Sequence, residues 1–189
     1  MERVAHLRER LLEFEREEQF GRAPGIGRLA PNFLERARHN LVLANAIYRI
    51  SEEREAKGAV RIDPAFTAYD WVIIAGYYAM YHASLSCLAK IGFKSESHAA
   101  TVMAMEYFFV HKQKKLEKEY ADLLGKAKGL EEQYVRMIWR IKERRETVQY
   151  QVDKDVSKRA AEEVLEDATR FVQRAAKLHE EMEEAGNEI

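Results

Sequence analysis

The longest uncharged stretch of the chain runs from Trp71 to Ala89 and contains no Asp, Glu, Lys or Arg. A helix of this length is long enough to cross a lipid bilayer. The stretch also contains His82, two serines and three tyrosines, however, and this polar content does not suit a helix that faces lipid. We therefore expect it to form the central helix of a folded domain, wrapped by amphipathic helices, and we expect no membrane partner.

The rest of the chain has the periodicity of amphipathic helices. Apolar residues recur three or four positions apart in several further segments, which are 2–19, 34–48, 102–109, 116–124, 130–148 and 164–182. No segment shows a convincing strand alternation. Short connections place successive helices side by side, so the sequence predicts an all-α fold, an antiparallel up-and-down helical bundle with an extra N-terminal helix.

Residues 21–31 separate the first helix from the rest of the chain. They contain three glycines and two prolines, a composition that interrupts helices. With 189 residues, the chain fits one domain plus an appendage. The predicted organisation is an N-terminal amphipathic helix and linker (1–31), a helical bundle (32–184) and a short tail (185–189).

Several helix ends are marked by residues that cap helices. Asn32 with Glu35, and Thr67 with Asp70, have the spacing of a capping box and predict two helix starts. Gly92 stands where the central helix needs a left-handed residue to end. Ser95 or Ser97 is predicted to cap the next helix.

Composition and charge exclude several classes of protein. The formal net charge of −1 argues against a general nucleic-acid coat protein, which would need an excess of Lys and Arg, but it leaves room for a local basic patch. Cys87 is the only cysteine, so the sequence predicts neither an internal disulfide nor a cysteine-rich zinc site. The first twenty residues are densely charged, unlike a signal peptide, and we expect a cytoplasmic protein.

No motif in the sequence calls for a cofactor or a metal ion. The glycines at positions 25 and 27 follow Pro24 rather than a strand, so they do not form a glycine-rich phosphate loop. No two histidines share a helix at four-residue spacing, and no carboxylate–histidine cluster resembles a di-metal bundle. We therefore expect neither cofactor nor metal.

Arg144 and Arg145 are candidates for binding phosphate. The apolar stripe that passes through Ile141 to Val148 also passes over Arg145, with Arg144 beside it. A guanidinium group on a buried seam must find a carboxylate, a phosphate or several carbonyl oxygens, because its charge cannot be neutralised. One interpretation is a structural ion pair with an acid of the core or of another subunit. The other is a site that binds a nucleotide or RNA phosphate.

His82 and His98 are candidates for the same kind of site. His82 follows Tyr78 by four residues, so both side chains lie on one face of the central helix. His82 is interpreted either as a core histidine bonded to a tyrosine or a carbonyl, or as a proton donor or phosphate ligand. His98 follows Ser97 at a predicted helix start, where free backbone N–H groups favour an anion. That position is interpreted as a phosphate site or as a plain cap.

These motifs, in this order, resemble the HEPN family (higher-eukaryote and prokaryote nucleotide-binding domains). The block from Gly76 to Ala83, which reads Gly-Tyr-Tyr-Ala-Met-Tyr-His-Ala, is the most specific of them. The other matching positions, in chain order, are Gly92, Ser97-His98, Arg145-Glu146 with Tyr150, and Ala168 with Phe171-Val172. The resemblance extends from about Asn32 to Leu178, and it points to the small prokaryotic HEPN proteins that are found beside minimal nucleotidyltransferases.

The resemblance implies a bundle of four or five helices that usually dimerises. Many members are metal-independent ribonucleases that carry an arginine followed, four to six residues later, by a histidine. There the arginine stabilises the charge of the phosphate, and the histidine acts as general base on a ribose 2′-hydroxyl. In this chain Arg145 matches the arginine, but Tyr150 stands in the place of the histidine. A tyrosine with its ordinary pKa of about 10 is a poor base at neutral pH.

Three functions are consistent with this pattern. In the first, the protein acts as a dimer with a nucleotidyltransferase partner, in a toxin–antitoxin-like pair, and binds nucleotide or RNA phosphate through Arg144, Arg145, His98 and Tyr78. In the second, it is an active ribonuclease that uses Arg145 with His82 or Tyr150. In the third, it is a purely structural interaction domain, in which these residues hold the bundle and its dimer together. All three share one fold, so the fold alone does not decide between them.

Overall fold

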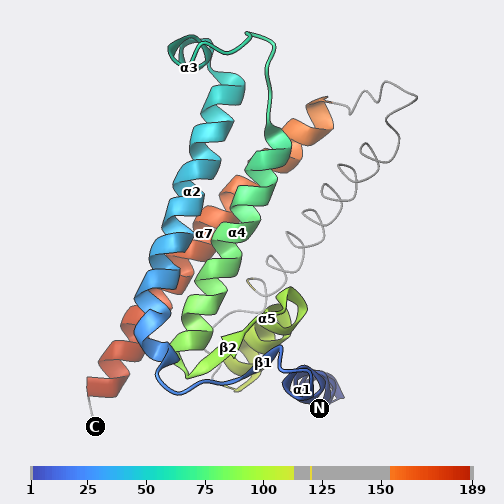
Figure 1. Cartoon of the computed structure of the whole chain (residues 1–189), viewed down its shortest axis with the longest axis vertical. Helices are drawn as coiled ribbons and strands as arrows, with labels where there is room; N and C mark the ends of the chain where they lie inside the picture. The colour runs from blue at the N-terminus through green and yellow to red at the C-terminus, as the bar shows by residue number, and fades with distance from the viewer. Residues whose placement is uncertain (1, 113–119, 121–153, 188–189) are drawn as a thin grey trace.

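The structure is a computed structural model of the chain, and it describes residues 2–112, 120 and 154–187. Three long helices make up the body of this described part: α2 (Ala30–Glu52), α4 (Tyr69–Lys90) and α7 (Lys154–Asn187). They lie side by side along the long axis of the molecule, and α4 packs against both α2 and α7 (Figure 1). The predicted all-α bundle with an extra N-terminal helix is confirmed.

Hydrogen bonds at both ends of α4 set its alignment with α2. At one end, the hydroxyl of Ser51 accepts a hydrogen bond from the backbone N–H of Ala68 (3.0 Å). At the other end, the hydroxyl of Ser86 donates to the carbonyl oxygen of Ala30 (2.7 Å). The end of α2 therefore lies beside the start of α4, and the end of α4 lies beside the start of α2. The two helices are antiparallel. A short helix, α3 (Arg54–Ala59), and a loop connect them.

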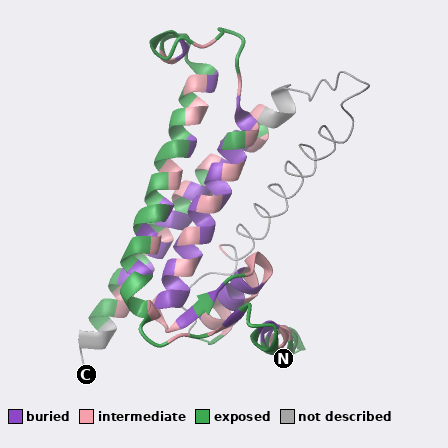
Figure 2. Cartoon of the chain, viewed as in Figure 1, coloured by how far each residue is buried: buried purple, intermediate pink, exposed green. Residues whose placement is uncertain are grey.

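The uncharged stretch forms most of α4 and is the core of the bundle. Most residues of α4 are buried, whereas α2 exposes a large part of its surface (Figure 2). Within the part of the chain that the structure describes, α4 is the one helix long and apolar enough to cross a membrane, but 78 % of its apolar window is buried inside the protein. Its length and hydropathy are accounted for by the neighbouring helices that cover it.

Gly76 allows α4 and α7 to approach each other closely. A Cβ atom at this position would lie 2.7 Å from Cγ1 of Val164 and 3.8 Å from Cβ of Ala168, both on α7. The shorter of these two distances is below the van der Waals contact of two carbon atoms, so a larger residue would push the helices apart. Val164 and Ala168 are themselves buried. The glycine is therefore a packing requirement of the α4–α7 contact.

Two of the predicted helix ends occur where their caps indicate. Gly92 follows α4 with a φ of 84°, a left-handed conformation that favours glycine. Ser97 caps α5 (His98–Met105), because its hydroxyl accepts a hydrogen bond from the backbone N–H of Ala100 at 3.4 Å. The end of α4 and the start of α5 were thus readable from the sequence.

Two predicted helix starts are wrong by a small margin. α2 begins at Ala30, two residues before Asn32, because Pro31 fits the first turn of a helix, where no N–H donor is needed. α4 begins at Tyr69, and no side chain caps it, so the predicted capping box at Thr67 does not form. Tertiary packing of these two helices compensates for the missing caps.

Two short strands, which the sequence pattern does not predict, join the N-terminal segment to the bundle. β1 (Phe20–Arg22) pairs antiparallel with β2 (Phe93–Ser95). Strands of three residues are too short for an apolar–polar alternation to be recognised. The rings of Phe20 and Phe93 stack with 5.3 Å between their centroids, which stabilises the pair. A 3-10 helix, η1 (Ile26–Leu29), then leads into α2, so residues predicted as a linker are folded structure.

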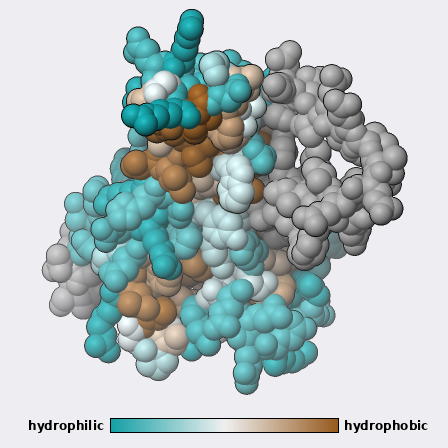
Figure 3. All heavy atoms as spheres, turned by 45° about the horizontal axis from the view of Figure 1, so that its top comes forward, coloured by the Kyte–Doolittle hydropathy of each residue, from teal (hydrophilic) through white to brown (hydrophobic). Residues whose placement is uncertain are grey.

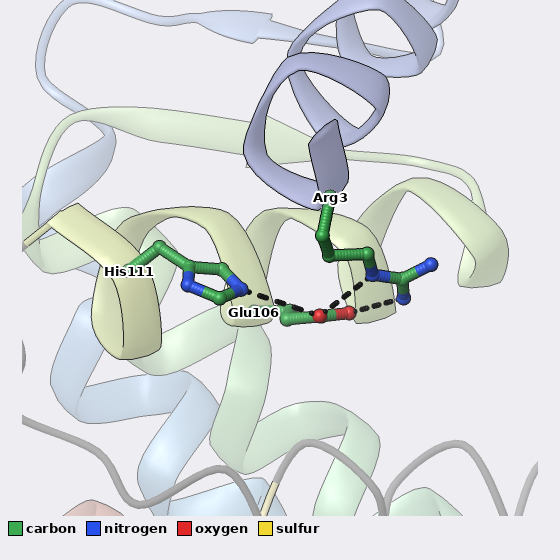
Figure 4. A network of polar contacts seen from close by, with 3 residues as sticks. All are labelled: Arg3, Glu106 and His111. Carbon is green, nitrogen blue, oxygen red and sulfur yellow. Dashed lines mark hydrogen bonds and ion pairs between the residues drawn. The ribbon is translucent and has the colours of Figure 1, made fainter. Parts of the chain in front are cut away.

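The extra N-terminal helix, α1 (Glu2–Arg16), packs against α5 and the segment after it. It buries three apolar side chains, those of Leu7, Leu11 and Phe14. Arg3 of α1 also donates two hydrogen bonds, from Nε (2.9 Å) and Nη2 (2.6 Å), to the carboxylate of Glu106 (Figure 4). Glu106 is buried and opens the π-helical segment η2 (Glu106–Lys112), which continues α5. α1 is therefore attached by both apolar and ionic contacts.

Candidate functional site

The predicted site residues fall into two groups. Arg144, Arg145 and Tyr150 lie outside the described residues, so their roles stay predictions. Tyr78, His82 and His98 are described, and the structure brings these three together.

A tyrosine–histidine cluster forms where α4 meets the start of α5. Its five members are Tyr77, Tyr78, Tyr81, His82 and His98. The first four come from α4, where residues four positions apart share a face of the helix and consecutive residues lie about 100° apart around it. His98 is the first residue of α5, and the Ser97 cap fixes where that helix begins. The cluster therefore joins residues about twenty positions apart in the chain.

His98 is held in the cluster by ring packing and a hydrogen bond. Its ring stacks on Tyr81 with 4.2 Å between centroids and an interplanar angle of 14°. Its Nδ1 is hydrogen-bonded to the hydroxyl of Tyr77, a fully buried residue. The ring of Tyr78 lies 6.0 Å away and perpendicular to that of His98. His98 thus has a structural role in the packing of α5 on α4, in addition to the phosphate-binding role predicted for it.

His82 is oriented through one of its two ring nitrogens. Nδ1 lies 2.8 Å from the carbonyl oxygen of Tyr78 and 3.1 Å from the side-chain amide of Asn40. A carbonyl oxygen can only accept, so Nδ1 carries the proton and donates it to Tyr78. The same assignment requires that the amide oxygen of Asn40, rather than its nitrogen, faces Nδ1. Within the described residues Nε2 makes no hydrogen bond and keeps its lone pair.

The surroundings of His82 favour its neutral form. Partial burial of the ring is the largest effect, and it lowers the pKa of His82. The hydrogen bond to the Tyr78 carbonyl raises the pKa, and the positive charge of Arg36 lowers it further. The ordinary pKa of histidine is 6.5, so at neutral pH His82 is unprotonated and its Nε2 is an acceptor. Burial also raises the pKa of Tyr81, which therefore remains a phenol.

Two residues near this site, Arg36 and Asn40, are absent from the residues selected on sequence alone. Both come from α2 and are four positions apart, so they lie on one face of that helix. Asn40 contacts His82 directly, and the charge of Arg36 acts on the His82 ring. Nothing in the sequence specifies which residue of α2 lies opposite His82. The residues of α2 that lie opposite His82 can be identified only once the alignment of α2 with α4 is known.

A second buried histidine belongs to a separate network. The hydroxyl of Ser86 donates to the carbonyl oxygen of Ala30, and Nε2 of His179 lies 2.8 Å from the same hydroxyl. Because the serine proton is already committed, Nε2 must donate to the Ser86 oxygen. His179 therefore cannot act as a base for Ser86, and this pair is not a nucleophilic dyad. Instead it connects α2, α4 and α7.

Two further observations concern reactive and metal-binding groups. Cys87 is fully buried in α4, and burial raises the pKa of its thiol to about 12. Among residues 2–112, 120 and 154–187, no group of three or more His, Cys, Asp or Glu side chains is arranged to hold a metal ion. Cys87 is thus a core residue, as its position in the uncharged stretch suggests.

Comparison with known families agrees with the resemblance read from the motifs. The sequence model described as "HEPN domain" matches residues 54–179, which is more than half of the chain. The chain belongs to the HEPN domain family. A comparison with curated proteins gave no significant match. The matched region contains α4, α5 and α7 as far as His179, whereas α1, β1 and α2 precede it.

Proposed function

We propose that this HEPN domain binds the phosphate of a nucleotide or of RNA, and that Tyr78 and His82 belong to the binding surface. The orientation of His82 is the observation that carries this proposal. Its Nδ1–H is held by the carbonyl of Tyr78, while Nε2 is an acceptor on a half-buried ring. A histidine oriented through one nitrogen, with the other facing outward, is typical of ligand-binding sites. Membership of a nucleotide- and RNA-related family supports the same class of ligand.

Arg144 and Arg145 supply positive charge in this proposal. The family resemblance matches Arg145 to an arginine that binds phosphate, and Arg144 is included because it stands next to Arg145 in the sequence. His98 is included because its ring contacts that of Tyr78, so a ligand at Tyr78 lies close to the start of α5. The backbone N–H groups at that start add a weak preference for an anion.

Metal-independent RNA cleavage is a second candidate function, and the state of His82 favours it. A general base must be unprotonated at the working pH, and the lowered pKa of His82 meets this condition better than a tyrosine does. In this candidate Nε2 of His82 removes the proton of a ribose 2′-hydroxyl, while Arg145 stabilises the charge on the phosphate. Tyr150 is the alternative proton acceptor.

A dimer and a nucleotidyltransferase partner, in a toxin–antitoxin-like pair, belong to the same proposal. Exposed apolar side chains support an interaction surface, because isolated domains seldom leave groups of them in water. The most exposed of the large apolar side chains are those of Val42 (68 % exposed), Trp71 (55 %) and Leu43 (51 %). Hydrophobic patches bordered by hydrophilic atoms also occur at the end of the bundle that carries α3 (Figure 3). A purely structural interaction domain would use these surfaces alone.

The experiment that tests the proposal is calorimetric binding of a short single-stranded RNA, compared with the double variant Arg144→Ala/Arg145→Ala. We expect the double variant to lose at least tenfold in affinity, because two charge-assisted contacts to phosphate are removed. Equal affinity of both proteins for the RNA would contradict the proposal. Light scattering of the parent protein in solution tests the dimer separately.

Cleavage is tested with the same RNA in the presence of EDTA. The parent protein, Arg145→Ala and His82→Ala are incubated in parallel, with circular dichroism as the control for folding. Loss of cleavage in both variants supports the ribonuclease candidate with His82 as base. No cleavage by the parent protein leaves the binding function and rejects the ribonuclease.

A further inference from the structure

α2 precedes the region matched by the family, yet it contributes polar side chains beside His82. The side-chain amide of Asn40 lies 3.1 Å from Nδ1 of His82. Arg36 stands one helical turn before Asn40, and residues at this spacing have Cβ atoms about 5–6 Å apart on the same face. The charge of Arg36 is close enough to act on the His82 ring. Arg36 and His82 therefore border one stretch of surface between α2 and α4.

Arg36 has no partner of its own within the described part of the chain. It is exposed, and no described residue forms an ion pair or hydrogen bond with it. Glu35, the acid next to it in sequence, lies 3.7 Å from His39 instead. By contrast, the exposed Arg49 is paired with Glu53 at 2.9 Å. An arginine without a carboxylate partner is suited to bind an external phosphate, because its planar guanidinium matches two phosphate oxygens.

The neighbouring His82 restricts what such a ligand must contain. Nε2 is an acceptor, so a bare oxyanion placed against it would be repelled, whereas a hydroxyl group would donate a hydrogen bond. The hydroxyl of Tyr78, on the same face of α4, makes no hydrogen bond within the described residues and can serve as donor or acceptor. The ligand must therefore present an anion to Arg36 and a hydroxyl donor to His82.

We infer that Arg36, Asn40, Tyr78 and His82 form a subsite for a phosphate ester that carries a hydroxyl on a neighbouring carbon. The phosphate binds Arg36, and the hydroxyl donates to Nε2 of His82. Asn40 holds the imidazole ring in place from the opposite side. A ribonucleoside 3′-monophosphate has this chemistry, and the 2′-deoxy compound lacks the hydroxyl. The subsite rests on the proposed phosphate-binding function and specifies where the ligand lies.

The test compares two arginines of α2 in the full chain. Arg36→Gln removes the proposed phosphate contact, and Arg38→Gln is the matched control. Arg38 is also exposed but lies about 200° further around the helix, where its charge acts on His179. Each protein is titrated with a ribonucleoside 3′-monophosphate, its 2′-deoxy counterpart and sulfate. Calorimetry gives the affinity, and the NMR signals of the His82 ring report whether the ligand reaches this site.

We expect the ribonucleotide to shift the His82 signals, Arg36→Gln to weaken its binding about tenfold, and Arg38→Gln to change it less than twofold. The deoxynucleotide should bind more weakly, also by about tenfold. Sulfate should bind only as the pH is lowered and His82 becomes protonated. Equal losses in the two arginine variants, or equal affinity for the two nucleotides, would overturn the subsite while the phosphate-binding function stands. Failure of the parent protein to bind any nucleotide would reject both.

Discussion

The carbonyl oxygen of Tyr78 lies 2.8 Å from Nδ1 of His82, one turn further along α4. This contact is local, yet it determines the chemistry of the His82 ring, because it fixes which nitrogen of the ring is protonated. With Nδ1 as donor, Nε2 is an acceptor, and it is accessible to solvent, because no buried side-chain nitrogen of the described residues lacks a hydrogen-bond partner. The ligand class proposed for this face depends on that assignment.

Acid should weaken the contact of α7 with the rest of the bundle. Burial, and then the charge of Lys90, lower the pKa of His179, whereas the unfolded chain has the ordinary value of 6.5. The folded state thus binds protons less readily than the unfolded state. Stability should be fully present above pH 6.5 and should fall as the pH drops toward the lower pKa of folded His179. The pKa of His82 is also lowered in the folded state, so His82 too should make the protein less stable in acid.

The melting temperature between about pH 7.5 and about pH 5 measures this effect. The variant His179→Gln keeps a donor for the Ser86 hydroxyl but cannot be protonated, so its melting temperature should depend less on pH. The same pH dependence in the parent protein and in His179→Gln would show that His179 is not responsible.

Replacing Gly76 by alanine should destabilise the fold by about 1–3 kcal/mol, the usual cost of overpacking a core. The added Cβ would lie 2.7 Å from Cγ1 of Val164. Gly58 on α3 is the matched control, because a Cβ there meets nothing within 4 Å. Gly58→Ala should be neutral or stabilising by about 0.5 kcal/mol. Urea unfolding of both variants measures the change in the free energy of unfolding. The double variant Gly76→Ala/Val164→Ala should recover part of the stability that Gly76→Ala loses.

Removing Arg3 should destabilise the attachment of α1. The Arg3 guanidinium lowers the pKa of the buried Glu106 carboxyl most, and His111 lowers it further. The side chain of Arg3 is 61 % exposed, so solvent screening limits the effect of Arg3→Ala to about 1 kcal/mol. Since the carboxylate has a lowered pKa in the fold, this contribution is present above its ordinary value of 4.5 and is lost as the pH falls below it.

Urea unfolding at neutral and acidic pH checks this prediction. Arg8→Ala is the control on the same helix, because Arg8 makes no ion pair or hydrogen bond with any described residue. A difference between Arg3→Ala and the parent protein that persisted unchanged in acid would argue against the ion pair as its cause.

Cys87 should not react with thiol reagents in the native protein. Its thiol is fully buried, and burial raises its pKa to about 12, so very little thiolate exists at neutral pH. Labelling by a thiol reagent should therefore follow unfolding and should accelerate with denaturant. Rapid labelling of the native protein would mean that α4 opens locally, in conflict with its central position.

The sequence predicted the features that depend on single helices. The uncharged stretch indicated a central helix, and α4 is buried along most of its length. Ser97 and Gly92 marked ends that occur as expected, because a cap acts on its own helix. The four-residue spacing of Tyr78 and His82 likewise placed both on one face of α4.

The pairing of residues from different helices was decided by the tertiary structure alone. Asn40 with His82, Ser86 with His179, and Arg3 with Glu106 are all far apart in the chain. Helical periodicity determines which face of a helix is apolar, but it leaves open how far one helix is shifted along another. That shift depends on how side chains interlock, as at Gly76 and Val164. For this reason the central helix could be found from the sequence, while Arg36 and Asn40 became candidates only when α2 was aligned with α4.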